Sequence, residues 1–352
     1  MNHRFAAIAA GMVAASLTLP GQALPAAPKT AAKSASAVKS SAYTPPKTPW
    51  GDPDLQGIWP AAFNIPRDRP ANLKDKAALS DEELAQALAD RAKQTATNRE
   101  RPADLVTIGP RYNWGEGGTL AKQTSLVIDP ADGRTPALTP EAAKIVRSER
   151  GGLGPGQHFP DKVDSWEDFD YYSRCITRGF PSSMLYTIYN YGNDITQGPG
   201  YVVIRNEMVH EQRVIPTDGR AHVGKEIKTY MGNSVGHWEG HTLVVETTNL
   251  KAHSGGGGRY TDAAKVTERF TRTSPSDLVY EATISDPNVW IRPFTLRYPY
   301  KLDPEYTLYE YACHEGNYMM LDSLIGARKL EAEGKDTRVL RGPAGGPLPG
   351  TR

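Results

Sequence analysis

Residues 200–250 read GYVVIRNEMVHEQRVIPTDGRAHVGKEIKTYMGNSVGHWEGHTLVVETTNL. Apolar and polar residues alternate along several short runs, a pattern typical of strands that bury one face. The strands expected here cover residues 201–206, 211–216, 226–231 and 242–249. Turn-forming residues separate them, with Glu239 and Gly240 as a two-residue hairpin loop before the last strand. The stretch therefore predicts antiparallel β structure.

Strand-like runs continue beyond this stretch and define the fold class. They cover residues 266–273, 278–284, 288–298 and 306–315, whereas residues 153–200 show no regular pattern. Helix-start signals and helical spacing predict helices at 81–97, 139–150 and 319–329. Consecutive strands at this spacing indicate a mainly β fold, an antiparallel lipocalin-like β-barrel or sandwich with helical and loop decorations from the N-terminal half. We expect one β-rich domain over residues 50–335.

Composition limits the class of partner. The chain has 352 residues, 33 glycines, 28 prolines and a formal net charge of +1. The glycine and proline content suits a turn-rich β protein. A nearly balanced charge without a basic block argues against nucleic acid as the main partner.

Residues 1–23 form the pattern of a secretory signal peptide: a short positive segment, an apolar run and small residues where a signal peptidase cleaves. The apolar run is shorter than the about 20 residues that a spanning helix needs, so we expect no membrane span. An Ala/Lys/Pro-rich linker over residues 24–49 and a Gly/Pro-rich tail over 336–352 are expected to be disordered. The protein is expected to be periplasmic or secreted.

The cysteines and histidines argue for a disulfide and against a metal site. Cys175 and Cys313 are the two cysteines of the chain. In an oxidising compartment they are expected to form a disulfide, with two buried free thiols as the alternative. His237 and His241 are four residues apart, but the expected hairpin points them to different faces, and a zinc site needs converging ligands. The chain also has no nucleotide-binding glycine turn, so we expect no cofactor.

Candidate acid–base residues lie on the expected strands and turns. On the last expected strand, Glu310 and His314 share one face, so the carboxylate could orient the imidazole for proton transfer. Glu207 and His210 offer a second such set, and His222 follows a turn that could face the barrel mouth. An exposed polar face or a purely structural pair is the alternative for each of them.

Candidate ligand-binding residues come from an irregular loop and from a hairpin. Arg178 and Arg213 could bind an anion, because guanidinium groups match carboxylates. Tyr189 and Asn190 could stack on an aromatic or sugar ligand and hydrogen-bond to it. Ordinary core packing and a charged hairpin end are the alternatives.

Seven segments resemble a family of uncharacterised exported bacterial proteins. They read PDLQGIW, SLVIDPADGRTPALTPE, RCITRGFP, PGYVVIRNEMVHEQRVIPTDGRAH, GHWEGHTLVVETTNL, VTERFTR and YEYACHEGNY, and they lie within residues 53–328. The positions that match the family pattern are Arg178, Glu207, His210, Arg213, His222, Glu246, Glu310, His314 and Asn317. This resemblance adds Glu246 and Asn317 to the candidate ligand-binding residues, and it implies no substrate.

Two details qualify the resemblance. The family has Asp-Ser-Arg-Gly-Arg-Trp-Glu-Gly-Asp where this chain has Asn-Ser-Val-Gly-His-Trp-Glu-Gly-His at residues 233–241. His237 and His241 are therefore not shared with it. A Gly-x-Trp at residues 57–59 is also similar, more weakly, to the opening of lipocalin-like (calycin) barrels.

The preferred function is cofactor-independent acid–base chemistry on a small polar or aromatic molecule, of lyase, isomerase or hydrolase type. The preference follows from several proton-transfer groups that occur without a nucleotide or metal signature. The alternatives are a lipocalin-like periplasmic protein that binds a small molecule without catalysis, and a scaffold or envelope-associated protein. The chain leaves open whether it forms a homo-oligomer.

Overall fold

The computed structural model describes residues 43–73, 75–100, 118–148, 163–254 and 260–335. The expected signal peptide (1–23), the tail (336–352) and the linker before residue 43 lie outside the described residues. Among the helices that are described, none combines the length and the apolar character needed to cross a bilayer.

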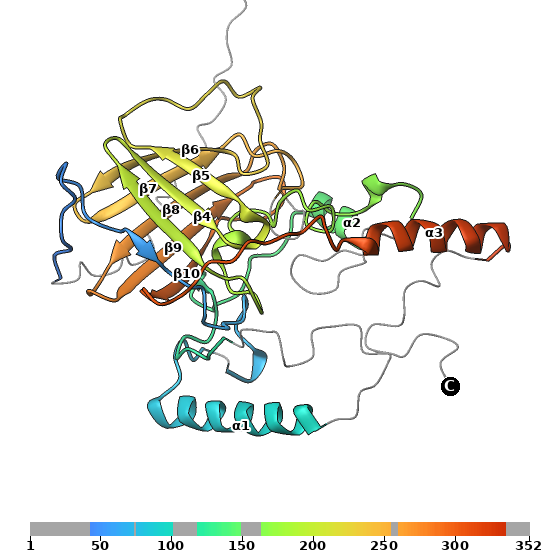
Figure 1. The fold of residues 1–352 in the computed structure, drawn as a ribbon, viewed down its shortest axis with the longest axis horizontal. Helices are drawn as coiled ribbons and strands as arrows, with labels where there is room; N and C mark the ends of the chain where they lie inside the picture. The colour runs from blue at the N-terminus through green and yellow to red at the C-terminus, as the bar shows by residue number, and fades with distance from the viewer. Residues whose placement is uncertain (1–42, 74, 101–117, 149–162, 255–259, 336–352) are drawn as a thin grey trace, which may run out of the picture. The chain divides into compact units, whose positions relative to one another are not determined.

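Two antiparallel sheets contain the described strands (Figure 1). The four-stranded sheet has the order β1 (Gly57–Ile58), β3 (Asn193–Gly198), β4 (Tyr201–Asn206) and β5 (Gln212–Pro216). The six-stranded sheet has the order β2 (Val127–Asp129), β10 (Phe294–Lys301), β9 (Asp277–Ser285), β8 (Lys265–Arg272), β7 (Thr242–Thr248) and β6 (Asn233–Glu239). The prediction of a mainly β, antiparallel fold is confirmed. The sheets do not close into a barrel, because no ladder joins β5 to β6 in the described part of the chain.

Three α-helices lie near the expected positions: α1 (Asp81–Glu100), α2 (Pro140–Ser148) and α3 (Tyr318–Ala332). Before α1, the Glu83 N–H donates to Ser80 Oγ at 3.2 Å and the Ser80 N–H donates to Glu83 Oε2 at 2.8 Å. This reciprocal pair is the expected capping box. Short 3₁₀ turns are η1 (Ala71–Leu73), η2 (Trp166–Asp168), η3 (Ser182–Met184) and η4 (Met208–His210).

The apolar faces of the two sheets meet in one core. Val202 and Ile204 of β4 alternate into it, and Tyr280 of β9 is fully buried there. Trp59 is also fully buried, and its indole N–H donates to the Leu55 carbonyl oxygen at 2.9 Å. The indole therefore contributes apolar area to the core without leaving a buried donor unsatisfied.

A buried ion pair joins the two sheets inside this core. The Arg213 guanidinium of β5 donates to both carboxylate oxygens of Glu268 on β8, at 2.7 and 2.9 Å. The Arg213 and Glu268 side chains are 3% and 0% exposed. The Tyr280 hydroxyl donates to the same carboxylate at 3.0 Å, and the guanidinium lies 4.2 Å from the Phe180 ring centroid. Arg213, expected to bind a ligand anion, therefore has its anion within the protein.

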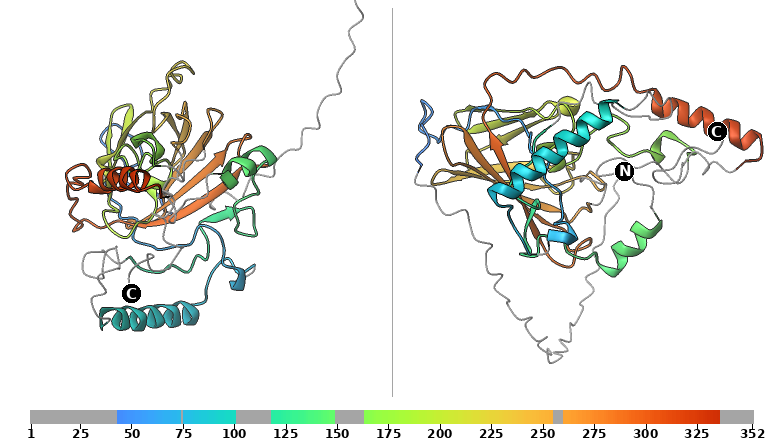
Figure 2. Two further views of the ribbon diagram at one scale, coloured as in Figure 1. Left: turned by 90° about the vertical axis from the view of Figure 1, so that its right-hand side faces the viewer. Right: turned by 90° about the horizontal axis from the view of Figure 1, so that it is seen from below.

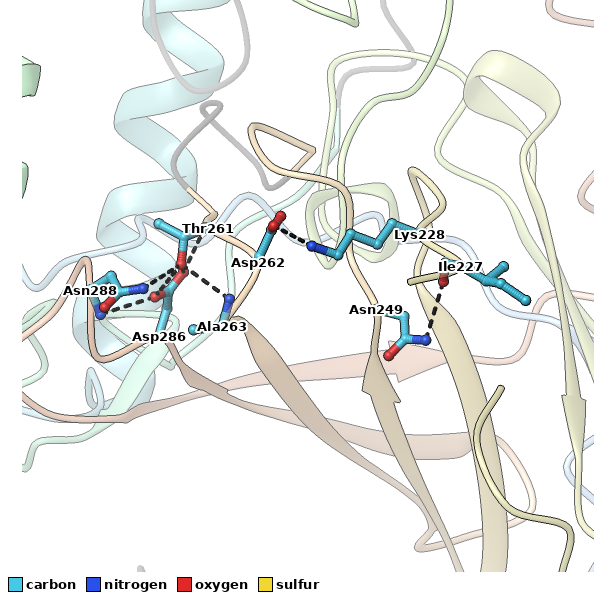
Figure 3. Close-up of polar contacts among 8 residues, drawn as sticks. All are labelled: Ile227, Lys228, Asn249, Thr261, Asp262, Ala263, Asp286 and Asn288. Atoms are coloured by element: carbon cyan, nitrogen blue, oxygen red, sulfur yellow. Dashed lines mark hydrogen bonds and ion pairs between the residues drawn. The ribbon is translucent and has the colours of Figure 1, made fainter. Parts of the chain in front are cut away.

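Residues 226–231 form turns and an isolated parallel bridge between Thr229 and Leu250 instead of the expected strand. The Asn249 side-chain amide holds this segment by donating to main-chain carbonyls at 2.9–3.2 Å. The accepting residues are Val223, Gly224 and Ile227, of which the last contact is visible in Figure 3. The strand prediction is wrong here because the segment pairs with the chain beyond β7 at Thr229 alone, while the Ile227 carbonyl accepts from a side chain.

The hairpin between β6 and β7 is shifted by one residue from the expected turn. Glu239 pairs with Thr242, so the loop consists of Gly240 and His241. Gly240 has φ +60°, and a glycine at the first loop position is the preference of a type II′ hairpin turn. His237 lies in β6 and is exposed, as is His241.

Residues 306–315, expected as a strand, run outside both sheets between β10 and α3 (Figures 1 and 2). β10 pairs with β9 along its whole length and with the short strand β2 at Thr295 and Leu296. Side chains hold the segment instead: the Tyr306 hydroxyl and the Tyr309 N–H each donate to the Glu207 carboxylate at 2.8 Å. The strand prediction is wrong because alternation alone does not supply a partner strand.

Candidate functional site

A cavity of about 250 Å³ lies where residues 169–175 meet residues 311–319. Its lining is aromatic and polar, and we call it the tyrosine pocket. The lining residues are Phe169, Tyr172, Ser173, Cys175, Tyr189, Tyr311, Cys313, Gly316, Asn317 and Met319. Of the residues expected to bind a ligand, Tyr189 and Asn317 meet here.

A disulfide fixes one wall of the tyrosine pocket. Cys175 and Cys313 are bonded, with Cα atoms 5.8 Å apart, which confirms the expected pairing. The Asn317 side-chain amide donates to the Ser173 carbonyl oxygen at 2.8 Å across the same junction. Together these contacts attach the irregular segment after β10 to the loop that follows η2.

Three tyrosines also line the tyrosine pocket. The hydroxyl oxygens of Tyr172 and Tyr311 lie 3.3 Å apart, and the ring of Tyr189 stacks on that of Tyr311 with centroids 6.3 Å apart. Burial raises the pKa of both Tyr172 and Tyr311, since it disfavours the phenolate. The two phenols are therefore neutral at physiological pH, and both residues line the cavity.

Arg178 and Glu211 lie next to these tyrosines. The Arg178 N–H donates to Glu211 Oε2 at 3.1 Å, and its guanidinium donates to the carbonyl oxygens of Leu185 and Tyr186 at 3.0 and 3.1 Å. Burial lowers the pKa of Arg178 and raises the pKa of the Glu211 carboxyl. A buried carboxyl with a raised pKa is a feature that functional sites share with some structural networks.

Glu211 was not among the candidate residues, and neither were Tyr172 and Tyr311. A sequence signal for Glu211 was present. Glu211, Arg213 and Ile215 occupy alternate positions of the expected strand and so share one face, and all three are buried. For the two tyrosines no local signal exists. They lie far apart in the chain and are brought together by the disulfide-linked junction.

We expect the Glu211 carboxyl to make stability fall as the pH rises. The folded state holds this proton more tightly than the unfolded chain does, so the stabilisation is present below the ordinary glutamate pKa of about 4.3. It is lost as the pH rises through the raised folded-state pKa. We would measure the free energy of unfolding of Glu211→Gln and of the unaltered protein by urea denaturation from pH 4 to 8. As the pH rises, the free energy of unfolding of the variant should increase relative to that of the unaltered protein. Glu310→Gln, at an exposed position, should track the unaltered protein, and a constant offset for Glu211→Gln would contradict the expectation.

Glu207 is a buried anchor rather than an open acid–base group. Asn190 Nδ2 and the Tyr309 N–H donate to its Oε1, at 2.9 and 2.8 Å. The Gly192 N–H and the Tyr306 hydroxyl donate to its Oε2, at 3.0 and 2.8 Å. Four donors on a carboxylate that is 4% exposed leave little room for a substrate. Asn190 was expected to bind a ligand, but its side-chain amide donates to the Glu207 carboxylate instead.

The three candidate histidines are not gathered in one pocket. His210 is exposed, and its Nδ1 lies 3.2 Å from the Tyr311 carbonyl oxygen. His222 lies beside β6 and β7, where its Nδ1 is 2.9 Å from Asn233 Oδ1 and its Nε2 is 3.5 Å from Glu246 Oε1. Glu246 also pairs with a lysine, Lys265. Among the residues lining the tyrosine pocket, none is a histidine.

Glu310 and His314 lie on the irregular segment, and both are exposed. Their expected common strand face does not exist, because residues 306–315 form no strand. Across the described ranges, no three His, Cys, Asp or Glu side chains gather as a metal-binding set.

Strained backbone marks the loop next to this site. Val209 and His210 have φ values of 61° and 46°. A positive φ is costly for a β-branched residue such as valine, and such strain concentrates at functional sites and ligand clamps. The two residues precede Glu211, so the strained turn positions the buried carboxyl.

No family model matches the chain, and no curated protein matches it. The resemblance to exported bacterial proteins and to lipocalin-like barrels therefore stays a prediction.

Proposed function

We propose that the protein is exported and binds a small, neutral molecule with a ring and hydroxyl groups, such as a sugar or a plant phenol, in the tyrosine pocket. The observation that carries this proposal is the pair of neutral phenols 3.3 Å apart beside a stacked third tyrosine. Phenol hydroxyls and an amide donate and accept hydrogen bonds, while the ring faces offer an apolar surface to a planar or pyranose ring.

Binding is favoured over histidine-based catalysis by the positions of the imidazoles. The interior between the sheets is mainly apolar apart from the Arg213–Glu268 pair, and the candidate histidines lie outside it, two of them exposed. The disulfide supports export, because such bonds persist in oxidising compartments.

Acid–base catalysis in the same pocket is a second candidate. It is favoured by the position of Tyr172 and Tyr311, whose hydroxyls lie 3.3 Å apart on residues that line the cavity. The raised pKa of each phenol makes it a weaker acid, so this candidate ranks second. In this case the reaction would be of lyase, isomerase or hydrolase type and would use one of these phenols as the acid.

Replacing Tyr311 or Tyr172 with phenylalanine should weaken binding of the correct ligand about 3–10-fold, because each change removes one hydroxyl while keeping the ring. A panel of monosaccharides and plant phenols would be screened by isothermal titration calorimetry. Tyr309→Phe is the matched control, because this tyrosine is 69% exposed and outside the pocket lining.

Equal affinities in all three variants would overturn the assignment of the pocket. Product formation by the unaltered protein, lost in Tyr311→Phe or Tyr172→Phe and kept in Tyr309→Phe, would select the catalytic candidate instead.

A further inference from the structure

A second, larger cavity of about 470 Å³ lies beside residues 178–188. We call it the apolar pocket, because its walls are mostly aliphatic and aromatic. Among the lining residues are Leu126, Leu185, Ile284, Leu296, Tyr260 and Trp290. Its volume falls within the roughly 300–1,000 Å³ typical of small-molecule sites. Ile188, also on the wall, is 43% exposed, which places one side of the cavity at the surface.

Two charged groups, Arg178 and Arg67, lie on this otherwise uncharged wall. Two of the five N–H groups of the Arg178 guanidinium donate to the Leu185 and Tyr186 carbonyl oxygens. Both acceptors are neutral, so within the described residues this cation has no carboxylate partner of the kind that Arg213 has in Glu268. Glu211 accepts from the Arg178 main-chain N–H instead of the guanidinium.

Arg178 is partly buried, and its guanidinium bonds to neutral carbonyls while the Glu211 carboxylate compensates its charge only through space. A ligand carboxylate bonded directly to the guanidinium would offset the remaining desolvation cost. Guanidinium and carboxylate groups form two parallel charge-assisted hydrogen bonds, which strengthen in an apolar environment. A second polar group lies on the same wall: the buried Trp290 Nε1 has no hydrogen-bond partner among the described residues.

We propose that the apolar pocket binds a monocarboxylate with an apolar body, whose carboxylate pairs with the Arg178 guanidinium. This site is separate from the tyrosine pocket, with which it shares no lining residue. The inference therefore stands whether or not a sugar or phenol binds in the tyrosine pocket.

The test uses octanoate and cinnamate as probes, with octanol and cinnamyl alcohol as matched neutral compounds. In titrations of the full chain, the carboxylates should bind at least tenfold more tightly than the alcohols. Arg178→Gln should weaken carboxylate binding about tenfold or more, because it removes the charged fork, and should leave the alcohols unchanged. Arg205→Gln, at an exposed arginine of β4, is the control and should leave all affinities unchanged.

Thr187→Trp is a second variant, which fills the cavity from its wall while keeping Arg178. It should weaken acids and alcohols alike, and its circular dichroism spectrum checks that it is folded. The proposal is overturned if acids and alcohols bind the unaltered protein equally, if neither binds, or if Arg178→Gln weakens both to the same extent.

Discussion

Replacing Arg213 with alanine should lower the free energy of unfolding by about 3–5 kcal/mol. The change leaves the Glu268 carboxylate, which is fully buried, without the bidentate guanidinium that compensates its charge. The Tyr280 hydroxyl still donates to it, but one neutral donor does not replace a cation. The side chain also covers the Phe180 ring, so packing is lost together with charge.

Urea denaturation at pH 7 measures this effect. Arg205→Ala is the matched control, because the Arg205 side chain is 54% exposed where it pairs with Asp194, and exposed pairs contribute about 0–1 kcal/mol. The double variant Arg213→Met with Glu268→Leu should recover most of the stability, since it removes both charges and keeps the volume. A loss in Arg213→Ala no larger than that in Arg205→Ala would show that the buried pair does not join the sheets energetically.

The double replacement Cys175→Ala with Cys313→Ala should lower the free energy of unfolding by about 2–5 kcal/mol. The bond joins residues 138 positions apart, so without it the unfolded chain gains conformational freedom that it otherwise lacks. The same bond attaches the segment that contains Tyr311 to the loop that contains Tyr172. We therefore expect the double variant to lose affinity for any ligand of the tyrosine pocket.

Thermal unfolding with and without reductant measures the contribution of the bond. Reductant should lower the midpoint of the unaltered protein and have no effect on the double variant, which has no cysteine left to reduce. A reductant effect of equal size in both proteins would mean that the loss has another cause. Carboxylate binding in the apolar pocket serves as an internal check, since neither cysteine lines it.

The strands that the sequence predicts well are those whose partners are close in the chain. The run at 201–206 is observed as β4, and those at 211–216, 266–273 and 278–284 are each within one residue of β5, β8 and β9. In each case a short turn sets the neighbour and alternation sets the buried face. The run at 306–315 alternates equally well and forms no strand, because its neighbours in space are side chains from distant parts of the chain.

The candidate site shows the same division between local and distant information. Residue type predicted a polar, aromatic region around residues 178–190, and Tyr189 of this region lines the tyrosine pocket. Residue type could not show that Glu207 is already occupied by four donors or that Arg213 is neutralised by Glu268. Those facts depend on which distant chain segments fold against one another. β3 (Asn193–Gly198) was not predicted, because its sequence, NDITQG, contains one apolar side chain and so shows no alternation of apolar and polar residues.

The Glu207 anchor has a consequence for the order of assembly. Two of its four donors, from residues 190 and 192, are synthesised before it, whereas the other two, from residues 306 and 309, emerge about a hundred positions later. A nascent chain that ends before Tyr306 therefore carries a half-satisfied carboxylate at the end of β4. We expect the four-stranded sheet to begin folding during synthesis. The hydrogen bonds to Glu207 at its edge are completed only after residues 306–309 have been synthesised.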